Sequence, residues 1–151
     1  FKLNVGYPSE SEELEIMRRS ANGVSAKVQP ALSISDVREL RSLVQRIYVD
    51  GKVEEYIISL VFATRSPASI GLTDLSRLIS NGASPRASIF LHRAAKAMAL
   101  LKGRGFVTPA DVKAVAPEVL RHRIGLTYEA EAQEVTSDEI VARILATVDV
   151  P

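Results

Sequence analysis

Hydrophobic residues recur every three or four positions along most of the chain, which is the spacing of one face of an α-helix. Each such run is bounded by a capping or turn signal. The expected helices run over about 10–20, from Ser35 to the break at Asp50-Gly51, from Val53 to Arg65, from Ser84 to Gly103, from Thr108 to about Ala116, and from Thr136 to Val148. The pattern therefore predicts a mainly α protein, a bundle of about five to six helices.

Three of these helices begin with a strong N-terminal signature. A serine or threonine is followed three residues later by an acidic residue that can bond back to it, which is the capping box. The three pairs are Ser9 with Glu12, Thr108 with Asp111, and Thr136 with Glu139. These starting points are the most sharply defined predictions along the chain.

Other segments are less regular. Pro117 removes one helical N–H and its ring clashes with the preceding turn, so we expect a break near Ala116 and a short helix after it. The stretch 24–34 is expected to form a loop, and Thr73 is expected to begin a short helix that ends at Ile79. Residues 125–135 show no periodic pattern and are expected to be irregular.

The first five residues alternate, with Phe1, Leu3 and Val5 apolar and the residues between them polar. That period of two predicts a half-buried strand. A single strand needs a sheet, and the sequence offers few other strand signals. We therefore expect the strand to belong to a sheet outside this chain, which would be part of a longer protein.

The composition narrows the possible classes. The chain has 151 residues, with 19 basic and 18 acidic side chains, and its net charge of +1 is too small to attract nucleic acid or an anionic membrane. It has no cysteine and only two histidines, which argues against disulfides and zinc sites, and no metal ligands are predicted. No apolar run is long enough to cross a bilayer, so we expect no membrane insertion.

Common catalytic motifs are absent. The sequence contains no phosphate-binding loop with its lysine, no dinucleotide-binding glycine pattern, no nucleophile elbow and no paired zinc-protease histidines. Its carboxylate-rich stretches, such as "SEELE", read as solvated faces. No catalytic residue is predicted.

One candidate binding site lies in "GASPRAS", residues 82–88. Ser84 is the expected N-cap and Pro85 the first helical residue, which places Arg86 in the first turn. The free N–H groups of that turn favour an anion. A cation there is therefore unfavourable by about 0.3–1 kcal/mol unless an anion binds beside it. The alternative is an exposed arginine paired with a surface carboxylate.

A second candidate is "RHRI", where Arg121, His122 and Arg123 stand together. They are interpreted either as a further cationic site or as a basic helix end that favours the last carbonyl groups. His92, in the middle of a helix, is interpreted as a structural histidine.

The stretch "GASPRAS", together with "HRAAKAMALLKGRGFVTPADVKAVAPEVLRHRIGL", "LVFATR" and "VGYPSESEELEIMRR", resembles the C-terminal part of MoxR-family AAA+ ATPases. The resemblance implies that residues 1–34 are the end of the nucleotide-binding core and its connector, with a short strand and a helix, and that residues 35–151 are the helical lid domain. It also implies that Arg86 is the sensor 2 arginine, which reaches the γ-phosphate of ATP beside Ser84 and Pro85.

The same resemblance implies a cytoplasmic, ring-forming and hexameric parent that uses ATP and Mg²⁺ and acts as a chaperone. Its partners would be neighbouring subunits and von Willebrand factor A domain proteins. The magnesium ligands and arginine finger would lie upstream of Phe1, so we expect this chain alone not to hydrolyse ATP. Two alternatives are a helical protein-interaction module without a nucleotide role and, less favoured by the balanced charge, a nucleic-acid binder.

Overall fold

Helices make up most of the part of the chain that the computed structural model describes, residues 1–23 and 27–151. The α-helices in these ranges are α1 (Glu10–Ala21), α2 (Ile34–Arg46), α3 (Gly51–Ala63), α4 (Pro85–Leu101), α5 (Pro109–Leu120), α6 (Tyr128–Ala132) and α7 (Ser137–Thr147). Two 3₁₀ helices, η1 (Pro67–Ile70) and η2 (Thr73–Arg77), and two strands, β1 (Ile79–Asn81) and β2 (Gly125–Leu126), complete them. The predicted mainly α class is confirmed.

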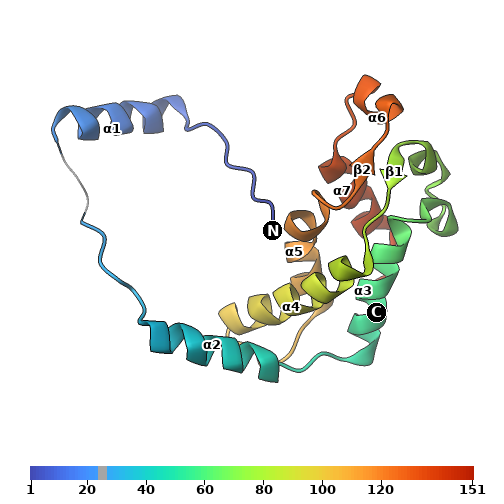
Figure 1. Ribbon diagram of the computed structural model, residues 1–151, viewed down its shortest axis with the longest axis horizontal. Coiled ribbons are helices and arrows are strands. Elements are labelled where there is room, and N and C mark those ends of the chain that lie inside the picture. Colours follow the sequence, from blue (N-terminus) through green and yellow to red (C-terminus); the bar gives the residue numbers. More distant parts are fainter. Residues whose placement is uncertain (24–26) are drawn as a thin grey trace.

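The core lies where α3, α4, α5 and α7 meet, as Figure 1 shows. Helix α4 packs most extensively against α5, and its buried residues include the small side chains of Ala87, Ala95 and Ala99. Leu91, on the same helix, is completely buried. Leu101, at the end of the helix, remains 81% exposed.

The predicted helix starts are confirmed where a capping box was present. The Ser9, Thr108 and Thr136 boxes all form, and α1, α5 and α7 begin directly after them. Helix α2 begins earlier than expected, with Ser33 rather than Ser35 as its N-cap. The reason is that Asp36 lies three residues after Ser33, and its carboxylate accepts the Ser33 N–H at 2.7 Å.

The predicted break before Pro117 is wrong. Helix α5 continues through this proline to Leu120. Buried side chains lie on both sides of it, Ala116 before and Val119 and Leu120 after, and they keep that face of the helix against the core. Burial of several apolar side chains offsets the one hydrogen bond that proline removes.

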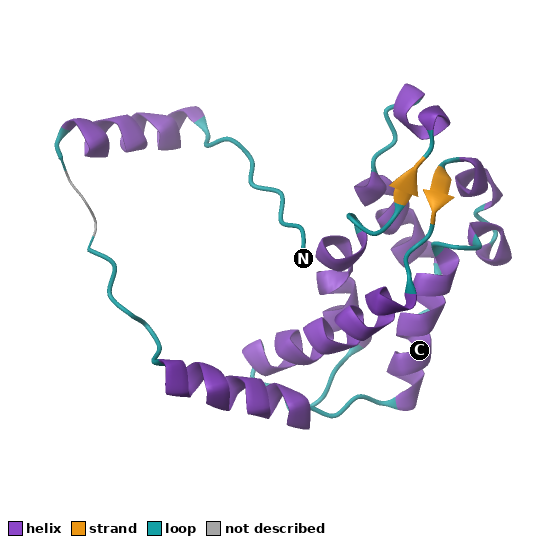
Figure 2. Ribbon diagram, in the orientation of Figure 1, coloured by secondary structure: helices purple, strands orange, loops and turns teal. Residues whose placement is uncertain are grey.

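Residues 125–135, expected to be irregular, contain β2 and α6. The two strands pair antiparallel, Ile79 opposite Leu126 and Asn81 opposite Gly125, and form the orange pair in Figure 2. A Cβ at Gly125 would lie 2.6 Å from the Ser80 Oγ, so a larger residue there would make the Ser80 side chain turn away. Such a short pair between distant residues leaves no local sequence pattern.

The N-terminal part stands apart from this bundle (Figure 1). Residues 1–9 form no strand within the described chain. The strand predicted for the first five residues was expected to pair with a sheet outside this chain, so it stays a prediction. A strand requires a partner edge, and the described chain gives this segment only one backbone contact with α5, from Lys2 N to Glu118 O at 2.9 Å. The predicted loop over 24–34 is seen from residue 27, and residues 24–26 lie outside the described ranges.

Candidate functional site

The start of α4 is built as the sequence predicts. Ser84 is the N-cap with an extended backbone, and Pro85 is the first helical residue. No side chain caps the first turn, and the first turn contains no acidic residue. Ala87 N donates to Ser84 O at 2.8 Å, so the turn closes through its backbone alone. The positive end of a long helix is therefore left without a negative side chain of its own.

The loop before α4 is held by the end of α3. The buried hydroxyl of Thr64 accepts the N–H of Ala83 at 2.9 Å and donates to Val61 O at 2.7 Å. Arg65 Nε donates to Ala83 O at 2.6 Å. A Cβ on Gly82 would lie 2.6 Å from Thr64 O, so only glycine permits this approach. These contacts fix the position at which α4 begins and therefore the position of Arg86. They were not predicted from the sequence, because Arg65 was assigned only to the end of α3.

Replacing Thr64 by valine is expected to lower the free energy of unfolding by about 1–3 kcal/mol, because the buried N–H of Ala83 loses its acceptor. Urea unfolding followed by circular dichroism measures the change. Thr147→Val is the matched control, because the Thr147 hydroxyl is exposed and donates only to Arg143 O within its own helix. Equal shifts of the urea midpoint in the two variants would contradict the proposed role of Thr64.

Arg86 is exposed at this helix start. Among the residues that the structure describes, it forms no ion pair, whereas Arg19, Arg77, Arg104, Arg121 and Arg143 each do. The alternative of an arginine neutralised by a surface carboxylate is therefore not what the described residues show. A guanidinium and the N-terminus of α4 together offer a site for an anion with several oxygens, such as a phosphate group.

A second arginine reaches the same face of α4. Arg123 lies over the ring of Phe90, 4.9 Å from the ring centroid to its guanidinium carbon. Phe90 follows Arg86 by four residues, so the two side chains are neighbours on one helix face. The structure thus places one residue of "RHRI" beside the helix face that carries Arg86, through the ring of Phe90.

Comparisons with known proteins show which proteins this chain is similar to. The AAA lid domain family matches residues 72–144. The chaperone MoxR1 of Mycobacterium tuberculosis is 42% identical over all of this chain and 40% of its own length. Protein MoxR of Methylorubrum extorquens is 33% identical, with 80% of this chain and 37% of its own length aligned. The crystal structure of a protein from Cytophaga hutchinsonii, described as a candidate ATPase, superposes with a TM-score of 0.90 and 43% identity over 97% of this chain and 45% of that one.

The chain belongs to the MoxR family of AAA+ ATPases. It spans less than half the length of the relatives it matches. The predicted start of the lid at residue 35 lies before the matched range, and its position there stays a prediction.

Two residues of "RHRI" are placed differently from Arg123 in this MoxR chain. Arg121 is already engaged, with its Nε 2.8 Å from the Asp138 carboxylate and its side chain only 11% exposed. His122 is exposed, but its ring is partly desolvated by neighbouring atoms, and this desolvation together with the charge of Arg123 lowers its pKa, which favours the neutral ring. Arg121 is thus used within the chain, and both a cationic site at these three residues and a contact between Arg123 and an anion stay predictions.

His92 is half-buried on α4, and its Nε2 lies 3.4 Å from Glu54 Oε1 on α3. The pair borders a groove of about 500 Å³ between the two helices, lined also by Ile57, Ile58 and Ile89. This partner agrees with the structural interpretation of His92. The groove lies one turn beyond Arg86 and does not include it.

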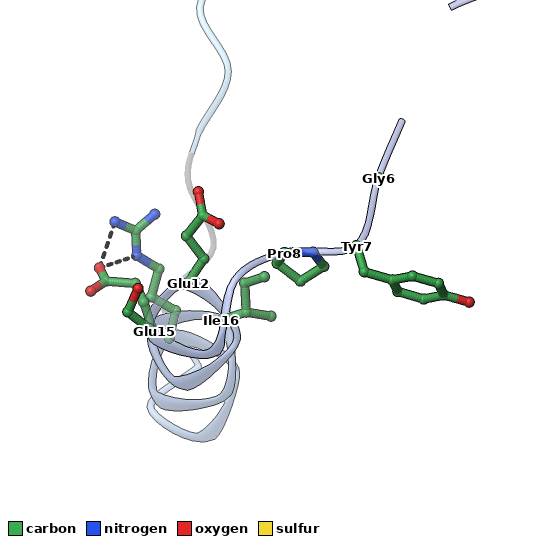
Figure 3. A pocket seen from close by; sticks show the side chains of 8 residues that line it. Gly6, Tyr7, Pro8, Glu12, Glu15 and Ile16 are labelled. Carbon is green, nitrogen blue, oxygen red and sulfur yellow. Dashed lines mark hydrogen bonds and ion pairs between the residues drawn. The ribbon is translucent and has the colours of Figure 1, made fainter. Parts of the chain in front are cut away.

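The largest hollows lie beside α1, outside the bundle. One of about 780 Å³ is lined by Tyr7, Pro8 and Ile16 together with acidic side chains of α1, as Figure 3 shows. All of these residues are exposed, and α1 buries none of its side chains, so the carboxylates of "SEELE" form a solvated face as predicted. Over the described residues there is no cluster of histidine and acidic residues suited to a metal ion, and no helix that could span a membrane.

Proposed function

We propose that this chain is the lid module of a ring-forming MoxR-type ATPase and that it closes over bound ATP. In this proposal Arg86 is the sensor 2 arginine, beside Ser84 and Pro85 at the start of α4. The observation that carries the proposal is an exposed arginine in an uncapped first turn, without an ion pair among the described residues. A triphosphate would supply the negative charge that both the helix end and the guanidinium lack.

The chemistry that the lid can supply is electrostatic. A guanidinium beside the γ-phosphate stabilises the negative charge that spreads over the phosphate oxygens during phosphoryl transfer. Magnesium and the attacking water would be held elsewhere in the whole protein, since the described residues contain no metal-ligand cluster. The lid would therefore contribute a charge and a movement, but no general base.

The N-terminal part supports the same assignment. Large apolar side chains are exposed on α1 and at the start of α2, among them Leu14, Met17, Ile34 and Val37. Such a set of exposed apolar residues is typical of a surface that another part of the protein covers. We propose that residues 1–34 belong to the nucleotide-binding core. Chaperone activity, a hexameric ring, a cytoplasmic location and von Willebrand factor A domain partners are further parts of this proposal.

Hydrogen exchange on the full-length protein tests lid closure over nucleotide. With a non-hydrolysable ATP analogue at about ten times its Kd, local opening at the start of α4 should slow by up to about tenfold. Amides of α6 serve as an internal control, because that helix is remote in sequence and lies at the top of the bundle in Figure 1, beyond the two strands. Unchanged exchange over residues 82–90 at saturating nucleotide would contradict the proposal.

A further inference from the structure

The extended N-terminal segment is bound to the lid through its backbone. Both main-chain polar groups of Lys2 are used: its N–H donates to Glu118 O at 2.9 Å, and its carbonyl accepts from Arg121 Nη1 at 2.9 Å. The two partners lie at the end of α5, more than a hundred residues away in sequence. Because the contacts are to the backbone, they do not depend on which side chain stands at position 2.

Arg121 is the centre of this contact. Besides the Lys2 carbonyl, it donates to Asp138 Oδ1 on α7 at 2.8 Å and lies 3.6 Å from Glu118 Oε1. Its side chain is only 11% exposed. One guanidinium therefore joins three elements, α5, α7 and the N-terminal segment. Its planar set of five donors suits it to bridging several oxygens at once.

Asp138 completes the arrangement with its second oxygen. Asn4 Nδ2 donates to Asp138 Oδ2 at 3.3 Å, while Oδ1 is taken by Arg121. Phe1 adds an apolar contact at the edge of a groove of about 340 Å³ between α4 and α5, lined also by Phe90, Met98 and Val115. The segment is thus bound by its backbone, by one amide side chain and by one aromatic ring.

The contact ends abruptly after Asn4. Val5 is 93% exposed and Tyr7 is fully exposed, and helix α1 buries none of its residues. Figure 1 shows the chain leaving the bundle near the start of the segment and reaching it again only at α2. The lid therefore holds residues 1–4 at one place and leaves the following residues without support.

We propose that Arg121, together with Asp138, forms a clamp that fastens residues 1–4 to the corner between α5 and α7. Arg121 is a positioning residue in this proposal, since it fixes the place of the N-terminal segment on the lid. One consequence rests on the proposed function. If residues 1–34 belong to the nucleotide-binding core, the clamp is a fixed point about which the lid rotates. Of the two arginines in "RHRI", Arg121 then binds other parts of the same chain, and only Arg123 remains available to bind an anion.

Backbone ¹⁵N relaxation of the chain measures the clamp directly and needs no nucleotide. In the wild type, the amides of Lys2, Leu3 and Asn4 should have order parameters near those of the lid helices, about 0.85, and the following residues lower values. In Arg121→Gln and in Asp138→Ala the first three should fall below about 0.6. The half-exposed Asp138 makes the second variant the safer one for folding.

Arg143→Gln is the matched control, because it removes an arginine from the same helix as Asp138 and breaks only the pair with Asp74. Its order parameters over residues 2–4 should equal those of the wild type. Wild-type values over residues 2–4 as low as those at 5–7 would overturn the clamp, as would unchanged values in Asp138→Ala. Neither result depends on ATP. Failure of the clamp would therefore not contradict the nucleotide role of Arg86, and failure of that role would not contradict the clamp.

Discussion

Replacing Asp111 by alanine is expected to lower the free energy of unfolding by about 3 kcal/mol. Breaking a buried ion pair by removing one partner costs about 3–5 kcal/mol. The lower end applies here because Asp111 is fully buried whereas Arg104, its main partner, keeps 27% of its side chain in contact with water. Urea unfolding followed by circular dichroism measures the loss.

The expectation follows from how completely the Asp111 carboxylate is satisfied. It accepts two hydrogen bonds from Arg104, one from Lys102, one from the N–H of Thr108 at 2.9 Å and one from the Thr108 hydroxyl at 2.8 Å. The carboxylate caps the first turn of α5 and joins it to the loop after α4. Alanine would remove the cap and leave both cations without their acceptor.

The pKa of Asp111 gives the same prediction in another form. Burial raises this pKa, but the hydrogen bonds from Arg104, Thr108 and Lys102 outweigh burial and hold it well below its usual range. A lowered folded-state pKa means that the stabilisation is fully present above the unfolded value of about 3.9 and is lost as the pH falls below it. The stability difference between wild type and Asp111→Ala should therefore shrink as the pH is lowered from 5 to about 2.

Asp74→Ala is the matched control for burial. Asp74 also receives two bonds from one arginine, Arg143, at 2.7 and 2.9 Å, but both side chains are about half exposed. Exposed pairs contribute little to stability, so this variant should unfold at nearly the wild-type urea concentration. Equal losses in the two variants would mean that burial is not what makes Asp111 important.

Replacing Arg86 by alanine in the full-length protein is expected to reduce ATP turnover by about a hundredfold. Removing one preorganised donor from a charge-stabilising site typically costs 10²–10³ in rate, and a hundredfold corresponds to about 2.7 kcal/mol of transition-state stabilisation. The lower figure is the better estimate, because the α4 N-terminus would still face the phosphate in the variant. Steady-state phosphate release measures the change.

The structure offers two controls for this experiment. Arg86 is exposed and makes no ion pair within the described residues, so its loss should leave the urea midpoint of the lid unchanged. Arg93→Ala removes an equally exposed arginine two turns along the same helix, and its turnover should stay within about twofold of the wild type. If Arg86→Ala kept the wild-type ATP turnover, the proposed contact of Arg86 with the phosphate would be contradicted, and Arg86 would be an ordinary surface arginine.

The local features were predictable from the sequence. The Ser9, Thr108 and Thr136 capping boxes fixed three helix starts, because each depends only on residues three positions apart. Ser84 and Pro85 placed Arg86 in the first turn of α4 for the same reason. The error at Pro117 shows the limit of such rules, since the proline penalty is local but the burial that outweighs it comes from the packed bundle.

The sequence by itself therefore determined the helical class, most helix boundaries and the position of the candidate arginine, because capping and amphipathic spacing act over one or two turns. Only the tertiary structure decided which groups meet: Thr64 with Ala83, Arg104 with Asp111, Arg121 with Lys2, and the guanidinium of Arg123 with the ring of Phe90. Two of these pairs join different helices or segments far apart in the chain through single hydrogen bonds. Such contacts leave no periodic trace, because their geometry is set by how the helices pack.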